Sequence, residues 1–418
     1  MTRLLAIMGS GETAPTMIKA HRQLFDRLGP PPVPAVLLDT PYGFQANADD
    51  ISARAVDYFA ASVGRPVEVA GLRHRDSDPV LRAAALAEVA AARWVFAGPG
   101  SPTYALRQWR GTELPDLLAD KLAHRGCVVF ASAAALTLGR YTVPVYEIYK
   151  VGADPVWEEG LGLIGFLGPE VAVIPHYDNA EGGHHDTRFC YLGEPRLARL
   201  EEQMGPDGWV LGVDEHTGCI FDLDAGRATV VGNGVVTVRR AGRSSVLESG
   251  RELPIAELVE LAFSGRGRAS GPVRDGSPGP SGARDAAPAP TALHSEIRRL
   301  EAEFDGCVAA ADVDGAVRAM LELDDVLTAW SGDTTQSDAA PRGRAAMRRM
   351  ISRLGDLART GARDPKEVVG PYVDALLAER AAARGGRRFS DADRIRDALV
   401  AAGIEVRDTP DGTVWDLS

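Results

Sequence analysis

The chain has 418 residues, of which 45% are hydrophobic and 25% are charged, and its net charge at pH 7 is −12. This composition fits a globular protein of two or three domains, and the negative charge argues against general affinity for nucleic acids or membrane surfaces. No apolar run is long enough for a secretion signal or for the roughly 20 residues that span a bilayer. The four cysteines are far apart, so we expect free thiols in a cytoplasmic protein.

A stretch rich in Gly, Pro, Ser and Arg divides the chain at residues 264–290. It has no apolar periodicity and cannot bury a core, which predicts a flexible linker. We therefore expect one domain at residues 1–263 and a second at residues 291–418.

The first domain alternates short β-rich runs with helical stretches. We expect strands at 4–8, 35–39, 67–71, 94–97 and 128–130, and helices at 16–28, 49–63, 78–91, 104–110 and 113–124. Continuous apolar strands between helices predict a doubly wound, mostly parallel α/β sheet. Beyond about residue 170 the strands become shorter, and the Gly-Asn-Gly between 229–231 and 235–239 predicts a hairpin turn.

Ser132 follows an apolar run and precedes small residues that begin a helix. An α/β hydrolase presents its nucleophile on such a turn, although serine is also a common helix N-cap. Two later segments offer partners in the order Ser, His, acid: His176 follows a short strand, and Asp214 and Glu215 follow another. A serine nucleophile needs such a base and such an orienting acid.

An acyl-transfer site also needs backbone N–H donors, because negative charge develops on the acyl oxygen. The turn after 94–97 contains Gly98 and Gly100, and we expect it to form an oxyanion hole with the N–H of Ala133. A plain strand-to-helix turn is the alternative. We further expect substrate contacts from Ser101, Glu12 and Arg188, since the guanidinium fork of Arg188 suits a carboxylate.

Five segments, in their order along the chain, resemble the dipeptidase E and cyanophycinase family over about residues 3–240. They are Gly9-Ser10-Gly11-Glu12, Phe96–Ser101, Ser132-Ala133, Pro175-His176-Tyr177 and Val213–Thr217. This is a serine-peptidase branch of the class I glutamine amidotransferase-like fold. The resemblance implies Ser132 as nucleophile, His176 as general base and Glu215 or Asp214 as the acid. It also implies cleavage of small acidic peptides or Asp-linked polymers without a cofactor.

The sequence departs from this family at Phe130 and Ala134, where the family has glycines that let the helix pack closely on the strand. A phenylalanine adds a large side chain at that crossing, which is compatible with a rearranged site or with lost activity. Two interpretations stay open: a serine-type hydrolase that cleaves a small peptide or amide bond through an acyl-enzyme, and a non-catalytic binding protein with a degenerate peptidase-like domain.

Imidazoles and carboxylates gather at His176, Asp178, His184, His185 and Asp186, and such groups could bind zinc. Gly182-Gly183 predicts a loop here, however, and no HExxH helix is present. We therefore expect solvated or substrate-binding residues, with no metal and no cofactor. A homodimer is open as well, since related α/β domains often pair.

The second domain has helical periodicity at 292–310, 313–328, 343–357, 365–384 and 390–402, which predicts an all-α bundle. A short β tail follows, in which Asp411-Gly412 predicts a hairpin. The segments 375–384, 389–399 and 402–415 resemble the C-terminal end of cysteinyl-tRNA synthetase. That resemblance implies contact with tRNA on the anticodon side, but no aminoacylation, because no HIGH-type or KMSKS-type segment is present.

Arginines are concentrated between residues 342 and 396. A basic stripe would contact RNA phosphates, and we expect Arg348, Arg349, Arg387 and Arg388 to contribute. The alternatives are solvated arginine–acid pairs along helices and a bundle that binds a protein partner.

Overall fold

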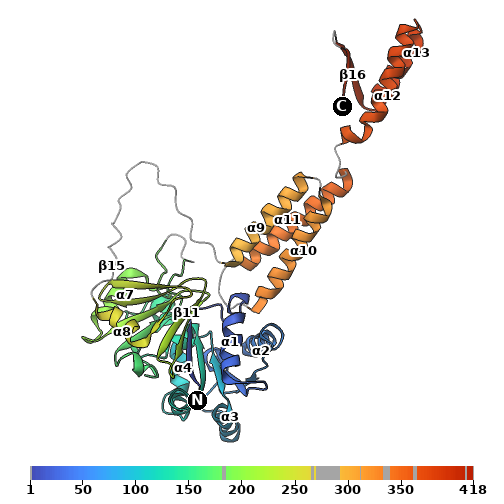
Figure 1. The fold of residues 1–418 in the computed structure, drawn as a ribbon. Coiled ribbons are helices and arrows are strands. Elements are labelled where there is room, and N and C mark those ends of the chain that lie inside the picture. Colours follow the sequence, from blue (N-terminus) through green and yellow to red (C-terminus); the bar gives the residue numbers. More distant parts are fainter. Residues whose placement is uncertain are drawn as a thin grey trace. The chain divides into compact units, whose positions relative to one another are not determined.

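The computed structural model describes residues 2–180, 185–264, 268–269, 292–310, 312–332, 339–360, 365–409 and 412–417. The chain forms two compact units, one of residues 1–290 with 328–338 and one of residues 291–327 with 339–418 (Figure 1). The predicted linker at 264–290 lies almost entirely outside the described residues.

The first sheet of the first unit has eight strands in the order β14-β11-β10-β1-β5-β4-β2-β3. Five strands form its parallel part: β1 (Arg3–Met8), β2 (Ala35–Leu38), β3 (Glu68–Val69), β4 (Trp94–Ala97) and β5 (Gly126–Ala131). Three antiparallel strands extend it: β10 (Thr217–Asp222), β11 (Arg227–Gly232) and β14 (Glu252–Pro254).

Both faces of this sheet are covered. Alternate residues of each strand point to opposite sides, and two separate apolar clusters result, one containing Leu5 and Ile7 of β1 and the other Leu4 and Ala6. The intervening helices are α1 (Ile18–Leu28), α2 (Ala48–Asp57), α3 (Pro79–Ala91), α4 (Pro102–Trp109), α5 (Leu114–Ala123) and α6 (Ser132–Leu136). Apolar strands buried on both faces explain why a wound parallel arrangement forms here.

A second sheet has the strand order β15-β13-β12-β9-β8-β6-β7. Its strands are β6 (Tyr141–Thr142), β7 (Glu158–Glu159), β8 (Val171–Ile174), β9 (Trp209–Val213), β12 (Val235–Arg240), β13 (Arg243–Glu248) and β15 (Arg268–Ala269). Helices α7 (Gly193–Glu202) and α8 (Ile255–Phe263) also belong to this unit. The predicted α/β class is confirmed, with the short later strands shared between two mixed sheets.

The predicted hairpin at Gly232-Asn233-Gly234 is wrong. Strand β11 pairs with β10 and β14 in the first sheet, whereas β12 pairs with β9 and β13 in the second. A Cβ on Gly232 would lie 2.2 Å from the carbonyl oxygen of His216, and one on Gly234 would lie 2.7 Å from Cβ of Asp214. These glycines therefore let the chain cross between sheets directly against the 214–216 turn.

The second unit contains α9 (Ala292–Ala309), α10 (Val313–Ala329) up to Leu327, α11 (Ala339–Thr360), α12 (Pro365–Gly385), α13 (Phe389–Ala401), β16 (Ile404–Thr409) and β17 (Gly412–Leu417). The predicted helical region and β tail are confirmed, and β16 pairs with β17 in antiparallel register. The hairpin predicted at Asp411-Gly412 falls partly on residue 411, which lies outside the described residues. Arg380 is buried and binds both carboxylate oxygens of Asp408, at 2.7 and 2.8 Å, which ties α12 to β16. Among the described helices, none is both long and apolar enough to cross a bilayer.

His21 is a fully buried histidine on α1. Its Nε2 donates to the carbonyl oxygen of Glu12 at 2.7 Å, and the rings of Phe59 and Trp94 contact its imidazole edge to face. Burial lowers the pKa of His21 from 6.5 to about 4, although the bond to Glu12 opposes this shift. The folded protein therefore holds this imidazole in its neutral form.

We expect His21 to make the unfolding free energy pH-dependent. Because its folded-state pKa lies below its unfolded value, this contribution is complete above pH 6.5 and is lost as the pH falls from 6.5 toward 4, by about 3 kcal/mol. The unfolding free energy, measured by denaturant melts at several pH values between 4 and 6.5, should fall more steeply with decreasing pH in wild type than in His21→Leu. The exposed His124→Gln variant is the control, and equal slopes for wild type and His21→Leu would contradict the prediction.

Candidate active site

Three strand ends bring Ser132, His176 and Glu215 together. Ser132 Oγ lies 2.9 Å from His176 Nε2, and His176 Nδ1 lies 2.8 Å from Glu215 Oε1. Ser132 follows β5 of the first sheet, whereas His176 and Glu215 follow β8 and β9, which are parallel neighbours in the second sheet. The hydrogen-bonded series therefore joins the two sheets, with Nδ1–H donating to the carboxylate and Nε2 facing the hydroxyl.

Ser132 occupies a strained turn between β5 and α6. Its φ of +49° lies in the left-handed region, which costs a residue with a Cβ roughly 1–2 kcal/mol. The N–H of Ala134 donates to the carbonyl oxygen of Gly98 at 3.1 Å, so the start of α6 is fastened to the turn after β4. A strained serine at this place is typical of a nucleophile elbow.

Phe130 and Ala134 do not displace this turn. The Phe130 side chain is completely buried beside Trp109 of α4, with ring centroids 5.8 Å apart, and both residues belong to the same apolar cluster as Ala134. Phe130 therefore packs into the core between the sheet and α4. With Phe130 in this position, Ser132 keeps a left-handed backbone and its Oγ lies 2.9 Å from His176 Nε2.

Glu215, and not Asp214, contacts His176. The exposed fractions of the His176 and Glu215 side chains are 14% and 11%. Burial alone would raise the pKa of Glu215, but hydrogen bonds from His176 and Asn179 hold that pKa below its ordinary value. The carboxylate is thus kept charged, as an orienting acid must be.

Asp214 has a different environment from Glu215. Its Oδ2 accepts the N–H of Val235 at 2.9 Å, which attaches this turn to β12. Burial, together with the negative charge of Asp178, raises the pKa of Asp214 to about 7. This side chain therefore holds the turn on which Glu215 lies.

The predicted oxyanion donors belong to two turns, the start of α6 and the turn after β4, which the Ala134–Gly98 hydrogen bond joins. Ala133 lies in the first turn of α6, where backbone N–H groups lack helical partners. In the turn after β4, Pro99 has no N–H, and the N–H of Ser101 donates to the carbonyl oxygen of Pro41 at 2.8 Å. Gly98 and Gly100 are therefore the two remaining donors of that turn, and a Cβ at Gly100 would lie 2.0 Å from the Pro41 oxygen.

The glycines that follow β1 support the acid turn. A Cβ on Gly9 would lie 2.0 Å from the carbonyl oxygen of Asp214, and one on Gly11 would lie 2.0 Å from His216 Nδ1. The N–H of Gly9 also donates to the carbonyl oxygen of Thr217 at 2.9 Å. These contacts give Gly9-Ser10-Gly11 a packing role against residues 214–217.

The three predicted substrate-binding residues, Ser101, Glu12 and Arg188, all have contacts within the protein. Ser101 caps α4, since its Oγ accepts the N–H of Tyr104 at 3.1 Å. Glu12 is buried, and a Cβ on Gly98 would lie 3.1 Å from its Oε1, so Glu12 lies beside the turn after β4. Arg188 binds Asp186 through two contacts of 2.8 Å, and this pairing competes with a role in binding a substrate carboxylate.

No group of three or more metal-ligating side chains gathers within the described ranges, which exclude His184. Two contacts of Glu215 were not predicted: Asn179 Nδ2 donates to Glu215 Oε1 at 3.3 Å, and Asp178 accepts the Glu215 N–H. Their place two and three residues after His176 was the available signal. The sequence alone also shows that Pro99, which has no backbone N–H, cannot be a donor in an oxyanion hole.

The predicted RNA-contacting arginines differ in their pairing. Arg349 pairs with Glu301 on α9, and Arg388 pairs with Asp391 at 3.3 Å. Arg348 and Arg387 are exposed and form no ion pair with any residue that the structure describes.

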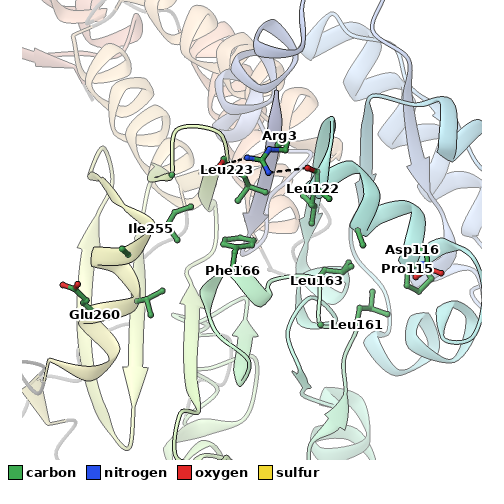
Figure 2. Close-up of a pocket in the computed structure, with 16 residues that line it drawn as sticks. Arg3, Pro115, Asp116, Leu122, Leu161, Leu163, Phe166, Leu223, Ile255 and Glu260 are labelled. Carbon is green, nitrogen blue, oxygen red and sulfur yellow. Dashed lines mark hydrogen bonds between the residues drawn. The ribbon is translucent and has the colours of Figure 1, made fainter. Parts of the chain in front are cut away.

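A cavity of about 930 Å³ lies near the amino end of β1, whereas Ser132 follows the carboxyl end of β5 (Figure 2). Its lining is mostly apolar and includes Leu122, Phe166 and Ile255. The guanidinium of Arg3, at the amino end of β1, is committed to Asp224 and to the carbonyl oxygens of Ala123 and Leu223. Since Ser132 follows the carboxyl end of β5, this cavity is separate from the triad.

Comparisons with known proteins find sequence relatives for the C-terminal part of the chain. The Cysteinyl-tRNA ligase anticodon binding domain family matches residues 369–415, which confirms the C-terminal resemblance. Cysteine–tRNA ligase of Methylibium petroleiphilum is 35% identical over 138 residues, covering 29% of this chain and 30% of that protein. The enzyme of Nitratidesulfovibrio vulgaris strain DP4 is 62% identical over 45 residues, covering 11% and 9%. These matches span less than a third of either relative.

The crystal structure of a peptidase from an acI-B1 actinobacterium is also similar, with a TM-score of 0.49 and 20% identity, covering 61% of this chain and 97% of that one. What the present chain does chemically therefore has to be inferred from its own side chains.

We expect Gly11→Ala to disturb the acid turn, because the added Cβ would collide with the His216 ring. A fluorophosphonate probe that reacts with activated serines should label Ser132 more slowly, on the order of 100-fold. Gly64→Ala is the matched control, since Gly64 has a similar positive φ, +73° against +64°, but nothing within 4 Å of its Cβ position. Equal labelling rates in the two variants would contradict the packing role of Gly11.

Proposed function

We propose that the α/β unit is a serine-type hydrolase that cleaves a small peptide or amide bond through an acyl-enzyme. The observation that carries this proposal is the series Ser132–His176–Glu215, with contacts of 2.9 and 2.8 Å on a strained nucleophile turn. Ser, His and a carboxylate in this geometry are recognised by their roles and not by their place in the sequence.

The reaction follows from the atoms in contact. Ser132 Oγ attacks the substrate carbonyl carbon while its proton passes to His176 Nε2, and Glu215 stabilises the imidazolium through Nδ1–H. His176 then returns the proton to the leaving nitrogen as the C–N bond breaks. Water, deprotonated by the same imidazole, hydrolyses the ester and restores Ser132.

Backbone donors complete this proposal. The N–H groups of Ala133 and of Gly98 or Gly100 would stabilise the negative charge on the acyl oxygen, and one such donor contributes about 3 kcal/mol in well-studied hydrolases. The Ser132–His176 contact, which coexists with a buried Phe130, supports a hydrolase over a degenerate binding domain. The resemblance to the dipeptidase E and cyanophycinase family makes Asp-containing dipeptides the first substrates to test.

We expect wild-type protein to react with a fluorophosphonate probe and Ser132→Ala not to react. His176→Ala should react more slowly by about 10²–10⁴-fold, because the general base is lost. Ser264→Ala and His124→Ala serve as matched controls, because both side chains are exposed and bond within the last turn of their own helices. Both variants should react like wild type.

The non-catalytic alternative predicts a different result. Wild-type protein that shows a cooperative melt but no labelling of Ser132 would refute the hydrolase. Labelling that survives Ser132→Ala would place the reactive serine elsewhere.

A second proposal concerns the C-terminal unit, which we infer contacts tRNA. The family match at residues 369–415 favours this function. Arg348 on α11 and Arg387 after α12 are the exposed candidates for phosphate contacts. Arg349 and Arg388 are engaged with Glu301 and Asp391, so their contribution should be smaller.

We expect tRNA binding by the full chain to weaken with salt. The double variant Arg348→Gln/Arg387→Gln should reduce the slope of log Kobs against log salt by about 1–2, since two phosphate contacts are removed. The matched control Arg349→Gln/Arg388→Gln removes the same charge from paired positions and should change the slope less. Wild-type binding without salt dependence would contradict an electrostatic RNA surface.

A further inference from the structure

His176 lies in the turn after β8, and Glu215 lies in the turn after β9. Residues of the turn after β8 also form hydrogen bonds to Glu215. We infer that Asn179 and Asp178 are positioning residues for Glu215, Asn179 through the carboxylate and Asp178 through the backbone. Asn179 Nδ2 donates to Glu215 Oε1 at 3.3 Å, and the N–H of Glu215 donates to Asp178 Oδ1 at 2.7 Å. The assignment rests on the proposed hydrolase and adds the means by which its acid is held.

The neighbouring strands place these turns side by side. Strands β8 and β9 are parallel, with Ile174 opposite Gly212, so their carboxyl ends meet at one edge. The N–H of Tyr177 donates to the carbonyl oxygen of Val213 at 3.1 Å, which continues the contact beyond the strands. A movement of either turn would therefore alter the His176–Glu215 distance.

Asn179 is a rigid support because it is itself held. Its side chain is buried, with 1% of the residue exposed, and its N–H donates to the carbonyl oxygen of His176 at 3.2 Å. Thr187 Oγ1 donates to the Asn179 carbonyl oxygen at 3.3 Å. The amide thus directs an N–H toward the same carboxylate oxygen that accepts from His176, at the longer distance of 3.3 Å.

Asp178 acts on the backbone of the acid turn. Its carboxylate accepts the Glu215 N–H, while Val235 donates to the neighbouring Asp214 carboxylate from β12. The two aspartates therefore hold the turn from different elements. Asp178 also brings a negative charge to the His176–Glu215 pair, which favours the protonated imidazole.

The two residues should shift the His176 titration in opposite directions when their charges are altered. Asn179→Asp adds a negative charge next to Glu215 and stabilises the imidazolium, so the midpoint rises. Asp178→Asn removes a negative charge but keeps an acceptor oxygen for the Glu215 N–H, so the midpoint falls. The other titratable groups that face Glu215 are His176, Asp214, His216 and Cys190, and all four residues are retained in both variants. Loss of the Asp178 charge also lowers the pKa of Asp214, so the titration of Asp214 is followed beside that of His176.

The experiment uses the full chain and measures the fluorophosphonate labelling rate of Ser132 against pH, beside nuclear magnetic resonance of ¹⁵N-labelled histidines assigned with His176→Ala. We expect Asn179→Leu to slow labelling about tenfold and to weaken the downfield His176 Nδ1–H signal, because one hydrogen bond to a charged group is lost. The acidic midpoint should rise by about one pH unit in Asn179→Asp and fall in Asp178→Asn. Asn47→Asp, at an exposed position on the N-terminal side of α2, controls for added charge.

The readouts separate failure of the inference from failure of the hydrolase. If wild type is not labelled, yet Asn179→Leu alters the His176 signal and the two charge variants shift its titration in opposite directions, the hydrolase is refuted and the positioning stands. If labelling occurs but the signal and the midpoints match wild type in all three variants, the positioning is refuted. Asn179→Asp and Asp178→Asn keep the side-chain shape, so the second comparison holds even where Asn179→Leu fails to fold.

Discussion

The crossing of the chain from one sheet to the other, at residues 214–216, is the constraint on which the candidate site depends. Strand β9 belongs to the second sheet and β10 to the first, and Glu215 lies in the short turn between them. Strand β10 runs beside β1, whose other neighbour is β5, the strand that ends at Ser132. The covalent path of the chain therefore limits how far the acid can lie from the nucleophile.

Backbone must approach backbone closely at this crossing, and glycine is the residue that allows it. Gly9 and Gly11, which follow β1, lie directly against this turn. Gly232 and Gly234, where the chain passes from β11 of the first sheet to β12 of the second, also lie against it. At each of these four positions a Cβ would come within 3.0 Å of the 214–216 backbone or side chains. Their shared function is steric, because each leaves space for the 214–216 turn where a Cβ would collide with it.

The sequence was most informative where a pattern is local. Ser132 and His176 follow short apolar strands, and a strand end is visible as a change from buried to polar residues. The choice between Asp214 and Glu215 was not local, because it depends on which side chain β12 engages through Val235. Gly232-Asn233-Gly234 has the residue pattern of a hairpin turn for the same reason, because only long-range pairing assigns the flanking strands to different sheets.

Phe130 shows how a departure from a family pattern can be absorbed. A large side chain two residues before the nucleophile conflicts with the turn only if it points toward the crossing helix. In this chain it points into the core beside Trp109, and α6 is just five residues long. Trp109 and Phe130 together fill the space between α4 and the sheet, while the methyl side chain of Ala134 keeps α6 close. The left-handed backbone of Ser132 is then maintained by packing on the strand side and by the bond from Ala134 to Gly98, without glycines at these two positions.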